Sequence, residues 1–127
     1  MKTKLRIQNG PAALSVVRLA SDAPWPPWLQ SKDGFFSVTR TDEELSIVCK
    51  QILVPPDARA EHGWRAFKIV GPIPFEMTGV LASVIAPLGE AGISIFAVST
   101  FDTDYILVKE ENWSPARAVL DDVVEWI

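Results

Sequence analysis

The feature that most constrains this chain is an internal repeat. Residues 36–50, FSVTRTDEELSIVCK, align without a gap on residues 96–110, FAVSTFDTDYILVKE, sixty positions further along. A looser match sets residues 14–19, LSVVRL, beside residues 64–69, WRAFKI, at an offset of fifty. Repetition at this scale indicates a fold that is built by pairing two similar small modules.

The composition fits one compact body that lies free of membranes and nucleic acid. The chain has 127 residues, of which 48% are hydrophobic, and this is enough to fill a core. No segment approaches the run of about 20 apolar residues that a membrane span needs. The formal net charge is -4 and the basic residues are scattered, which suits a phosphate backbone poorly.

Two further features predict a cytoplasmic protein. Cys49 is the single cysteine, so it cannot form an internal disulfide. The first residues, MKTKLRIQ, are basic but are not followed by the apolar core of a secretory signal.

The first half reads mainly as strands joined by turns. The expected strands are Lys2–Gln8, Ala13–Leu19, Phe35–Arg40, Leu45–Lys50 and Trp64–Val70. A turn at Asn9–Pro11 separates the first two, and Thr41–Glu44 closes a hairpin between the next two. The segment Ser21–Gln30 holds three prolines and two tryptophans, so it cannot form a long helix. Its tryptophans would fill the core in place of a helix, and a polyproline-type docking motif is the alternative.

The second half has a clearer helical pattern. Apolar residues recur at helical spacing from Thr78 to Leu88, and Gly92 stands where a left-handed cap would end the helix. A second hairpin follows, formed by Ser94–Thr100 and Tyr105–Lys109. A closing helix is expected to begin at Ser114 and Pro115, with its buried stripe at Val119, Leu120, Val123, Val124 and Ile127.

This order of strand, helix, strand, strand and helix is one strand short of a ferredoxin-like βαββαβ unit. We expect the missing strand to come from the N-terminal segment Lys2–Gln8, which would interlock the two halves. The predicted fold class is therefore α+β.

The run GVLASVIAPLGEAGISIFAVSTFDTDYILVKEE, residues 79–111, resembles the ACT domain, a small-molecule-binding regulatory module found in aspartokinases and many enzymes of amino-acid metabolism. The related run SVTRTDEELSIV, residues 37–48, extends the likeness into the first half, as in tandem ACT proteins of the arginine-sensor type. The resemblance implies two interlocked ferredoxin-like ACT units with antiparallel sheets. Residues 1–62 would form a degenerate unit with a shortened helix, and residues 63–127 a regular one.

A receptor for a free amino acid must offer donors to a carboxylate and acceptors to an ammonium group. The loop over residues 72–79 leads into the expected helix, where the amides of Thr78, Gly79 and Val80 and the positive end of the helix dipole favour an anion. Gly79 has no side chain to keep a ligand away, although the same glycine could serve helix packing instead.

For the ammonium group, the ACT resemblance implies acidic residues at the second hairpin turn and a ligand held where two modules meet. Asp102 and Asp104 are the acidic candidates. The hydroxyl partners would be Ser99, Thr100 and Thr103, and the apolar lining would be Ile73, Phe75 and Phe101. Asp42 and Glu44 hold the matching places in the first copy, so a shared turn geometry is an alternative explanation for all four acidic residues.

We expect no catalytic centre, no cofactor and no metal site. His62 is the only histidine, which excludes most nucleophile and base arrangements, and Cys49 has no metal-ligand spacing around it. Adjacent carboxylates such as Glu110 and Glu111 do not converge on one point of a helix or strand.

These observations predict a non-enzymatic regulatory protein that binds an amino acid or a similar small molecule. The alternative is a module without a ligand that forms a homodimer or docks a regulated protein. A small enzyme on an ACT-like scaffold is a third and weaker hypothesis, because a fold does not fix a function.

Overall fold

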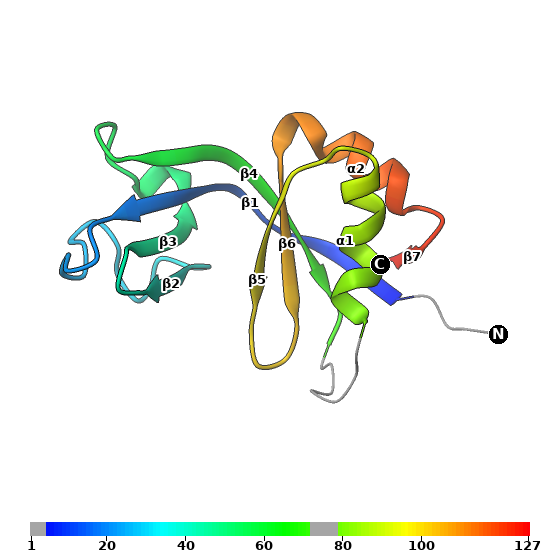
Figure 1. Ribbon diagram of the computed structural model, residues 1–127, viewed down its shortest axis with the longest axis horizontal. Coiled ribbons are helices and arrows are strands. Elements are labelled where there is room, and N and C mark those ends of the chain that lie inside the picture. The colour runs from blue at the N-terminus through cyan, green and yellow to red at the C-terminus, as the bar shows by residue number, and fades with distance from the viewer. Residues whose placement is uncertain (1–4, 72–78) are drawn as a thin grey trace. The chain divides into compact units, whose positions relative to one another are not determined.

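The computed structural model describes residues 5–71 and 79–127 (Figure 1). The strands are β1 (Leu5–Leu19), β2 (Ser37–Arg40), β3 (Leu45–Lys50), β4 (Ala60–Ile69), β5 (Ile95–Ser99), β6 (Asp104–Lys109) and β7 (Val124–Trp126). The helices are α1 (Val80–Glu90) and α2 (Trp113–Leu120), with short 3-10 helices η1 (Gln51–Leu53) and η2 (Glu110–Asn112). The fold is α+β with a largely antiparallel sheet, as the sequence predicts.

The chain divides into two compact units. The helical unit comprises the described parts of residues 1–10 and 65–127, and the strand unit comprises residues 11–64. Both β1 and β4 contribute residues to each unit. The strand segment at residues 5–10 therefore belongs to the same unit as the second half of the chain.

The helical unit has its elements in the order β4, α1, β5, β6, α2 and β7, which is a βαββαβ order. Its strands lie side by side in the order β7, β1, β4, β6 and β5. The β5–β6 hairpin and α1 match the predicted elements, and Gly92 has the expected left-handed φ of 75°.

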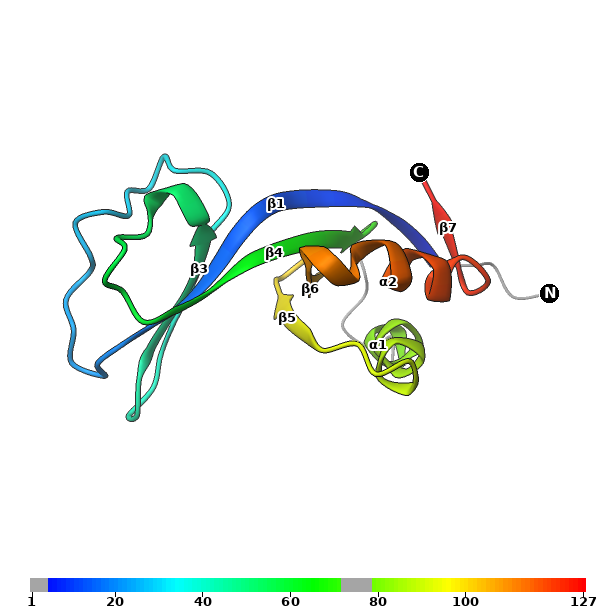
Figure 2. The same ribbon diagram turned by 90° about the horizontal axis from the view of Figure 1, so that it is seen from above.

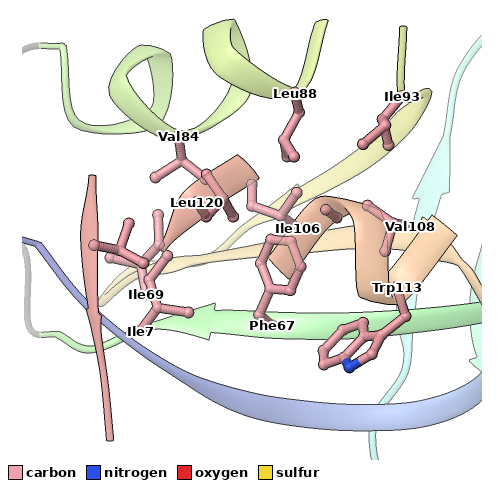
Figure 3. Close-up of a cluster of buried hydrophobic side chains, with 12 residues drawn as sticks. Ile7, Phe67, Ile69, Val84, Leu88, Ile93, Ile106, Val108, Trp113 and Leu120 are labelled. Atoms are coloured by element: carbon pink, nitrogen blue, oxygen red, sulfur yellow. The ribbon is translucent and has the colours of Figure 1, made fainter. Parts of the chain in front are cut away.

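Both helices of this unit cover one face of its strands (Figure 2). Val84 and Leu88 of α1 point toward the ring of Phe67 on β4, and Leu120 of α2 lies beside them (Figure 3). These side chains are fully buried, so the apolar stripe of each helix and one face of the strands form a shared core.

The strand unit has neighbours in the order β2, β3, β1 and β4, and residues 20–36 form neither helix nor strand. Leu29 is 1% exposed in its core, against Val17 and Ile47, while Trp28 is only partly buried there. The prediction that Ser21–Gln30 forms no long helix is confirmed. The side chain of this segment that fills the core, however, is Leu29 rather than a tryptophan, since Trp25 is half exposed.

Two expected strands at the N-terminus prove to be one. The expected turn at Asn9–Pro11 is wrong, because β1 runs without interruption from Leu5 to Leu19. Gly10 serves close packing here, since a Cβ atom added to it would lie 3.2 Å from the carbonyl oxygen of Ala66 on β4. Ala13 adopts a φ of 56°, and this left-handed residue changes the local path of the chain within the strand.

The closing helix, α2, is shorter than the sequence predicts. It begins at Trp113 and ends at Leu120, after which the chain forms β7, parallel to β1. Val123, which precedes β7, is 40% exposed and so does not belong to the predicted buried stripe, whereas Val124 is 3% exposed. The last strand of the βαββαβ order is therefore β7.

The repeat is offset by 59 positions in the structure, not by sixty. Thr41 donates its amide to the carbonyl of Glu44, and Thr100 does the same to Thr103, which places Thr41 on Thr100, 59 residues apart. The 3-10 helices that follow begin at Gln51 and Glu110, again 59 residues apart. Asp42 and Glu44 are thus the counterparts of Phe101 and Thr103, and their predicted match to Asp102 and Asp104 is wrong.

Candidate functional site

The β5–β6 turn is held by hydrogen bonds from its own threonines. The amide of Thr100 donates to the carbonyl of Thr103 over 2.8 Å, and the hydroxyl of Thr100 donates to the same carbonyl over 3.1 Å. Thr103 is 6% exposed, and its hydroxyl donates to the carbonyl of Ile69 on β4. The turn is therefore joined to the end of β4.

The predicted acidic and hydroxyl residues differ in their surroundings. Ser99 donates its hydroxyl to the carboxylate of Asp104, so these two side chains are paired with each other. Asp102 is exposed and has no hydrogen bond or salt bridge with the residues the structure describes. Phe101 is 79% exposed at the tip of the turn. Among the predicted acids, Asp102 is the one whose carboxylate can meet a ligand.

A hollow of about 230 Å³ lies beside this turn and is lined by Lys68, Gly71, Asp102 and Thr103. We refer to it as the hairpin hollow. Gly71 brings the chain very close to the turn, since a Cβ atom added there would lie 2.6 Å from the carbonyl oxygen of Asp102. Glycine at this position therefore allows the end of β4 and the turn to form one wall.

The hairpin hollow is lined by one basic and one acidic residue. Lys68 is partly buried on β4, and Asp102 is exposed on the turn. Neither is in a salt bridge with any residue of the described ranges, whereas Arg65 pairs with Glu110 over 3.2 Å. The hollow can thus present an ammonium group and a carboxylate to the same small molecule.

The structure describes two of the residues predicted to bind a ligand at the start of α1, Gly79 and Val80. Gly79 is the residue before the helix and has a left-handed φ of 77°, with no atom within 4 Å of an added Cβ. Backbone conformation, rather than close packing, therefore requires glycine there. Val80 packs against the core of the helical unit. Ile73, Phe75 and Thr78 lie outside the described residues.

The sequence analysis missed Lys68 and Gly71. Lys68 lies between the buried residues Phe67 and Ile69, so its alternation along the strand was a signal that it faces away from that core. Its distance in sequence from the β5–β6 turn left no signal that the two would meet.

Other reactive side chains are engaged in structure. Cys49 is fully buried, and burial together with the charge of Asp33 raises the pKa of its thiol to about 11. His62 lies with its Nδ1 atom 2.6 Å from the hydroxyl of the buried Ser15. No group of three or more metal-binding side chains occurs in residues 5–71 and 79–127. Over the same ranges, no helix has the length and hydrophobicity for a membrane crossing.

Solved structures of other proteins share this fold. A crystal structure of an Agobacterium tumefaciens protein is 37% identical, with a TM-score of 0.90 over 99% of this chain and 94% of that one. The ligand-free regulatory subunit of aspartate kinase from Thermus thermophilus has a TM-score of 0.55 at 12% identity, over 94% of this chain and 95% of its own. The second similarity shows a shared fold alone.

Named relatives match over part of their length. The human protein named cytosolic arginine sensor for mTORC1 subunit 1 is 33% identical over 109 residues, which are 80% of this chain and 32% of the relative. A bovine protein of the same name is 32% identical over 67% of this chain and 29% of its own length. This chain therefore spans about a third of the length of these relatives.

Two family models match consecutive parts of the chain. One describes an N-terminal domain and matches residues 13–57. The other describes the ACT domain and matches residues 59–122, which is half of the sequence. The chain belongs to the ACT domain family.

Proposed function

We propose that this chain is a non-enzymatic regulatory protein of the cytoplasm, which binds a free amino acid or a similar small zwitterion in the hairpin hollow. Membership of the ACT family supports a regulatory role, and so do relatives named as cytosolic arginine sensors. In this proposal the chain consists of two interlocked ferredoxin-like units, with the site in the second.

The observation that carries the proposal is that Lys68 and Asp102 line the same small hollow. The carboxylate of an amino acid would bind the ammonium group of Lys68, and its ammonium group would bind the carboxylate of Asp102. Hydrogen bonds between charged groups are among the stronger polar contacts in proteins. The two side chains lie on different elements, so the ligand would join β4 to the β5–β6 turn.

The size of the hollow agrees with this class of ligand. Its volume of about 230 Å³ is below the roughly 300–1,000 Å³ of pockets that hold drug-sized molecules. A single amino acid is small enough to enter, whereas a dinucleotide or a haem would need a larger cavity.

The first test is thermal denaturation of the full chain in the presence of each common amino acid, singly and at millimolar concentration. A ligand at a hundred times its dissociation constant should raise the free energy of unfolding by about 2.7 kcal/mol, which is a clear shift in Tm. No shift with any amino acid would contradict the proposal.

The second test places the ligand in the hollow. Asp102→Ala removes the acceptor for the ammonium group, and a charged hydrogen bond contributes about 1.5–3 kcal/mol, so we expect Kd to rise about 10- to 150-fold by calorimetry. Glu43→Ala is the matched control, because Glu43 is the counterpart of Asp102 at the repeat offset of 59. Equal affinity for both variants and the unaltered protein would exclude this site.

A further inference from the structure

The first hairpin turn carries a basic side chain from the neighbouring strand, and this contact has no equivalent in the second. Arg18 of β1 donates Nη2 to the carbonyl oxygen of Glu43 over 3.0 Å. Glu43 corresponds to Asp102, because the two turns have the same hydrogen bond between their first and fourth residues. The guanidinium of Arg18 therefore stands at the turn position that faces the hairpin hollow in the other copy.

A second arginine ties the surrounding segment to the first hairpin. Arg40, at the end of β2, donates from its guanidinium to the carbonyls of Ser21 and Ala23, the latter over 2.6 Å. At the repeat offset its counterpart is Ser99, whose short side chain bonds within its own hairpin. The irregular segment of the first copy is thus held against its hairpin by the protein's own cation.

At the second turn the basic side chain is a lysine. Lys68 of β4 lines the hairpin hollow with Asp102, and it makes no hydrogen bond or salt bridge to a residue in the described ranges. An arginine has a planar fork of donors that can bind a carbonyl and a carboxylate together, while lysine offers one compact ammonium group. Lysine therefore leaves the carbonyl and carboxylate of Asp102 available.

We infer that Arg18 is a built-in occupant of the first copy, and that lysine at position 68 keeps the second copy open, so that each chain has one ligand site. This inference rests on the proposed function and adds the residue that selects between the two copies. In the second copy the ammonium group of the ligand binds Asp102, where the first copy has the guanidinium of Arg18 beside Glu43.

The test is Lys68→Arg, which keeps the charge and supplies the fork. Each common amino acid is titrated singly at millimolar concentration into the unaltered protein and into the variant by calorimetry. We expect one bound amino acid per unaltered chain and an affinity at least about tenfold lower in Lys68→Arg. Lys32→Arg, on the exposed loop of the strand unit, is the matched control and should bind as the unaltered protein does.

A readout independent of binding separates the two proposals. In a crystal structure of Lys68→Arg without any amino acid, the introduced guanidinium should donate to the carbonyl of Asp102, as Arg18 does to that of Glu43. If no amino acid binds the unaltered protein but the introduced guanidinium makes this hydrogen bond, the proposed function fails and closure of the hollow is supported. A guanidinium that does not reach that carbonyl, unchanged affinity in Lys68→Arg, or two bound amino acids per unaltered chain would overturn the inference.

Discussion

Gly71 stands where the end of β4 meets the β5–β6 turn, and its lack of a side chain sets the shape of the hairpin hollow. A Cβ atom there would lie 2.6 Å from the carbonyl oxygen of Asp102, a distance at which the backbone must move. We predict that Gly71→Ala lowers the free energy of unfolding by about 1–3 kcal/mol, as overpacking does. Urea denaturation followed by tryptophan fluorescence would measure the change.

Gly89 provides the matched control for this prediction. It lies within α1 and an added Cβ would meet no atom within 4 Å, so alanine there should add about 0.4–1 kcal/mol of stability. Opposite signs for the two glycines are expected. A loss of equal size at both positions would show that close approach to the turn is not what constrains Gly71.

Cys49 is a buried thiol whose pKa of about 11 keeps it protonated near neutral pH. Only the thiolate reacts readily with disulfide reagents, so the folded protein should label slowly at pH 8 and rapidly after denaturation in guanidinium chloride. Cys49→Ser should show no labelling in either state. Rapid labelling of the folded protein would contradict the prediction.

The same thiol predicts how stability changes at high pH. The unfolded thiol, with its ordinary pKa of 9.0, releases its proton before the folded one, whose pKa is about 11. The contribution of Cys49 is therefore fully present below pH 9 and is lost as pH rises toward about 11. Cys49→Ser should reduce this loss in denaturation curves measured across that range.

At the scale of elements, β7 shows how a short strand is held at the end of a chain. Trp126 packs its ring edge-on against Phe67 at 5.9 Å, and its indole nitrogen donates to the carboxylate of Asp121 over 2.9 Å. Arg117 of α2 lies 4.4 Å from the centre of the same indole ring. Three kinds of contact therefore converge on one side chain of a three-residue strand.

We predict that Trp126→Ala lowers the free energy of unfolding by about 2–4 kcal/mol, because it removes a large, partly buried ring. Limited proteolysis should then cut the chain after Leu120 sooner than in the unaltered protein. Trp25→Ala is the control, since Trp25 is 50% exposed and should matter less. Equal losses at both tryptophans would show that β7 is not anchored in this way.

The strands of both hairpins were predicted from local patterns, but the register of the repeat was not. Alternating apolar residues correctly predicted β2, β3, β5 and β6, but the ungapped alignment set the repeat one residue too long. The turns decide the register, because the hydrogen bonds of Thr41 and Thr100 identify equivalent positions. A shift by one residue moves each side chain to the opposite face of a strand, so the acidic residues were compared with the wrong partners.

At the scale of the whole molecule, each unit has its own buried cluster. Leu88 belongs to the core of the helical unit and Leu29 to that of the strand unit. The unit boundaries place residues 5–10 with residues 65–127. The sequence predicted a boundary after residue 62, with Lys2–Gln8 completing the second half. Hydrogen exchange can test which division describes the cooperative units.

We predict that Leu88→Ala speeds amide exchange in residues 5–7, and that Leu29→Ala does so mainly in β2 and β3. Each substitution should lower the free energy of unfolding by about 2–5 kcal/mol, so the two variants are matched in severity. Faster exchange of residues 5–7 in Leu29→Ala alone would contradict the assignment of this segment to the helical unit.

Much of this protein follows from patterns that are local in the chain. Hydrophobic periodicity and proline content were enough to predict the hairpins, α1 and the absence of a long helix in Ser21–Gln30, while the resemblance of residues 79–111 to ACT domains predicted the family. Each of the structural predictions depends on neighbours within a few residues, where backbone geometry limits the choices.

Long-range contacts decided the rest. The strand β7 was read as helix because both states can bury Val124, and only its pairing with β1 distinguishes them. Lys68 and Asp102 line one hollow because β4 and the β5–β6 turn are brought together by the sheet and by the hydrogen bond from Thr103 to Ile69. The repeat predicted two similar modules, but the equivalent turns differ in their surroundings. Arg18 donates a hydrogen bond to the first turn, and the hairpin hollow lies beside the second.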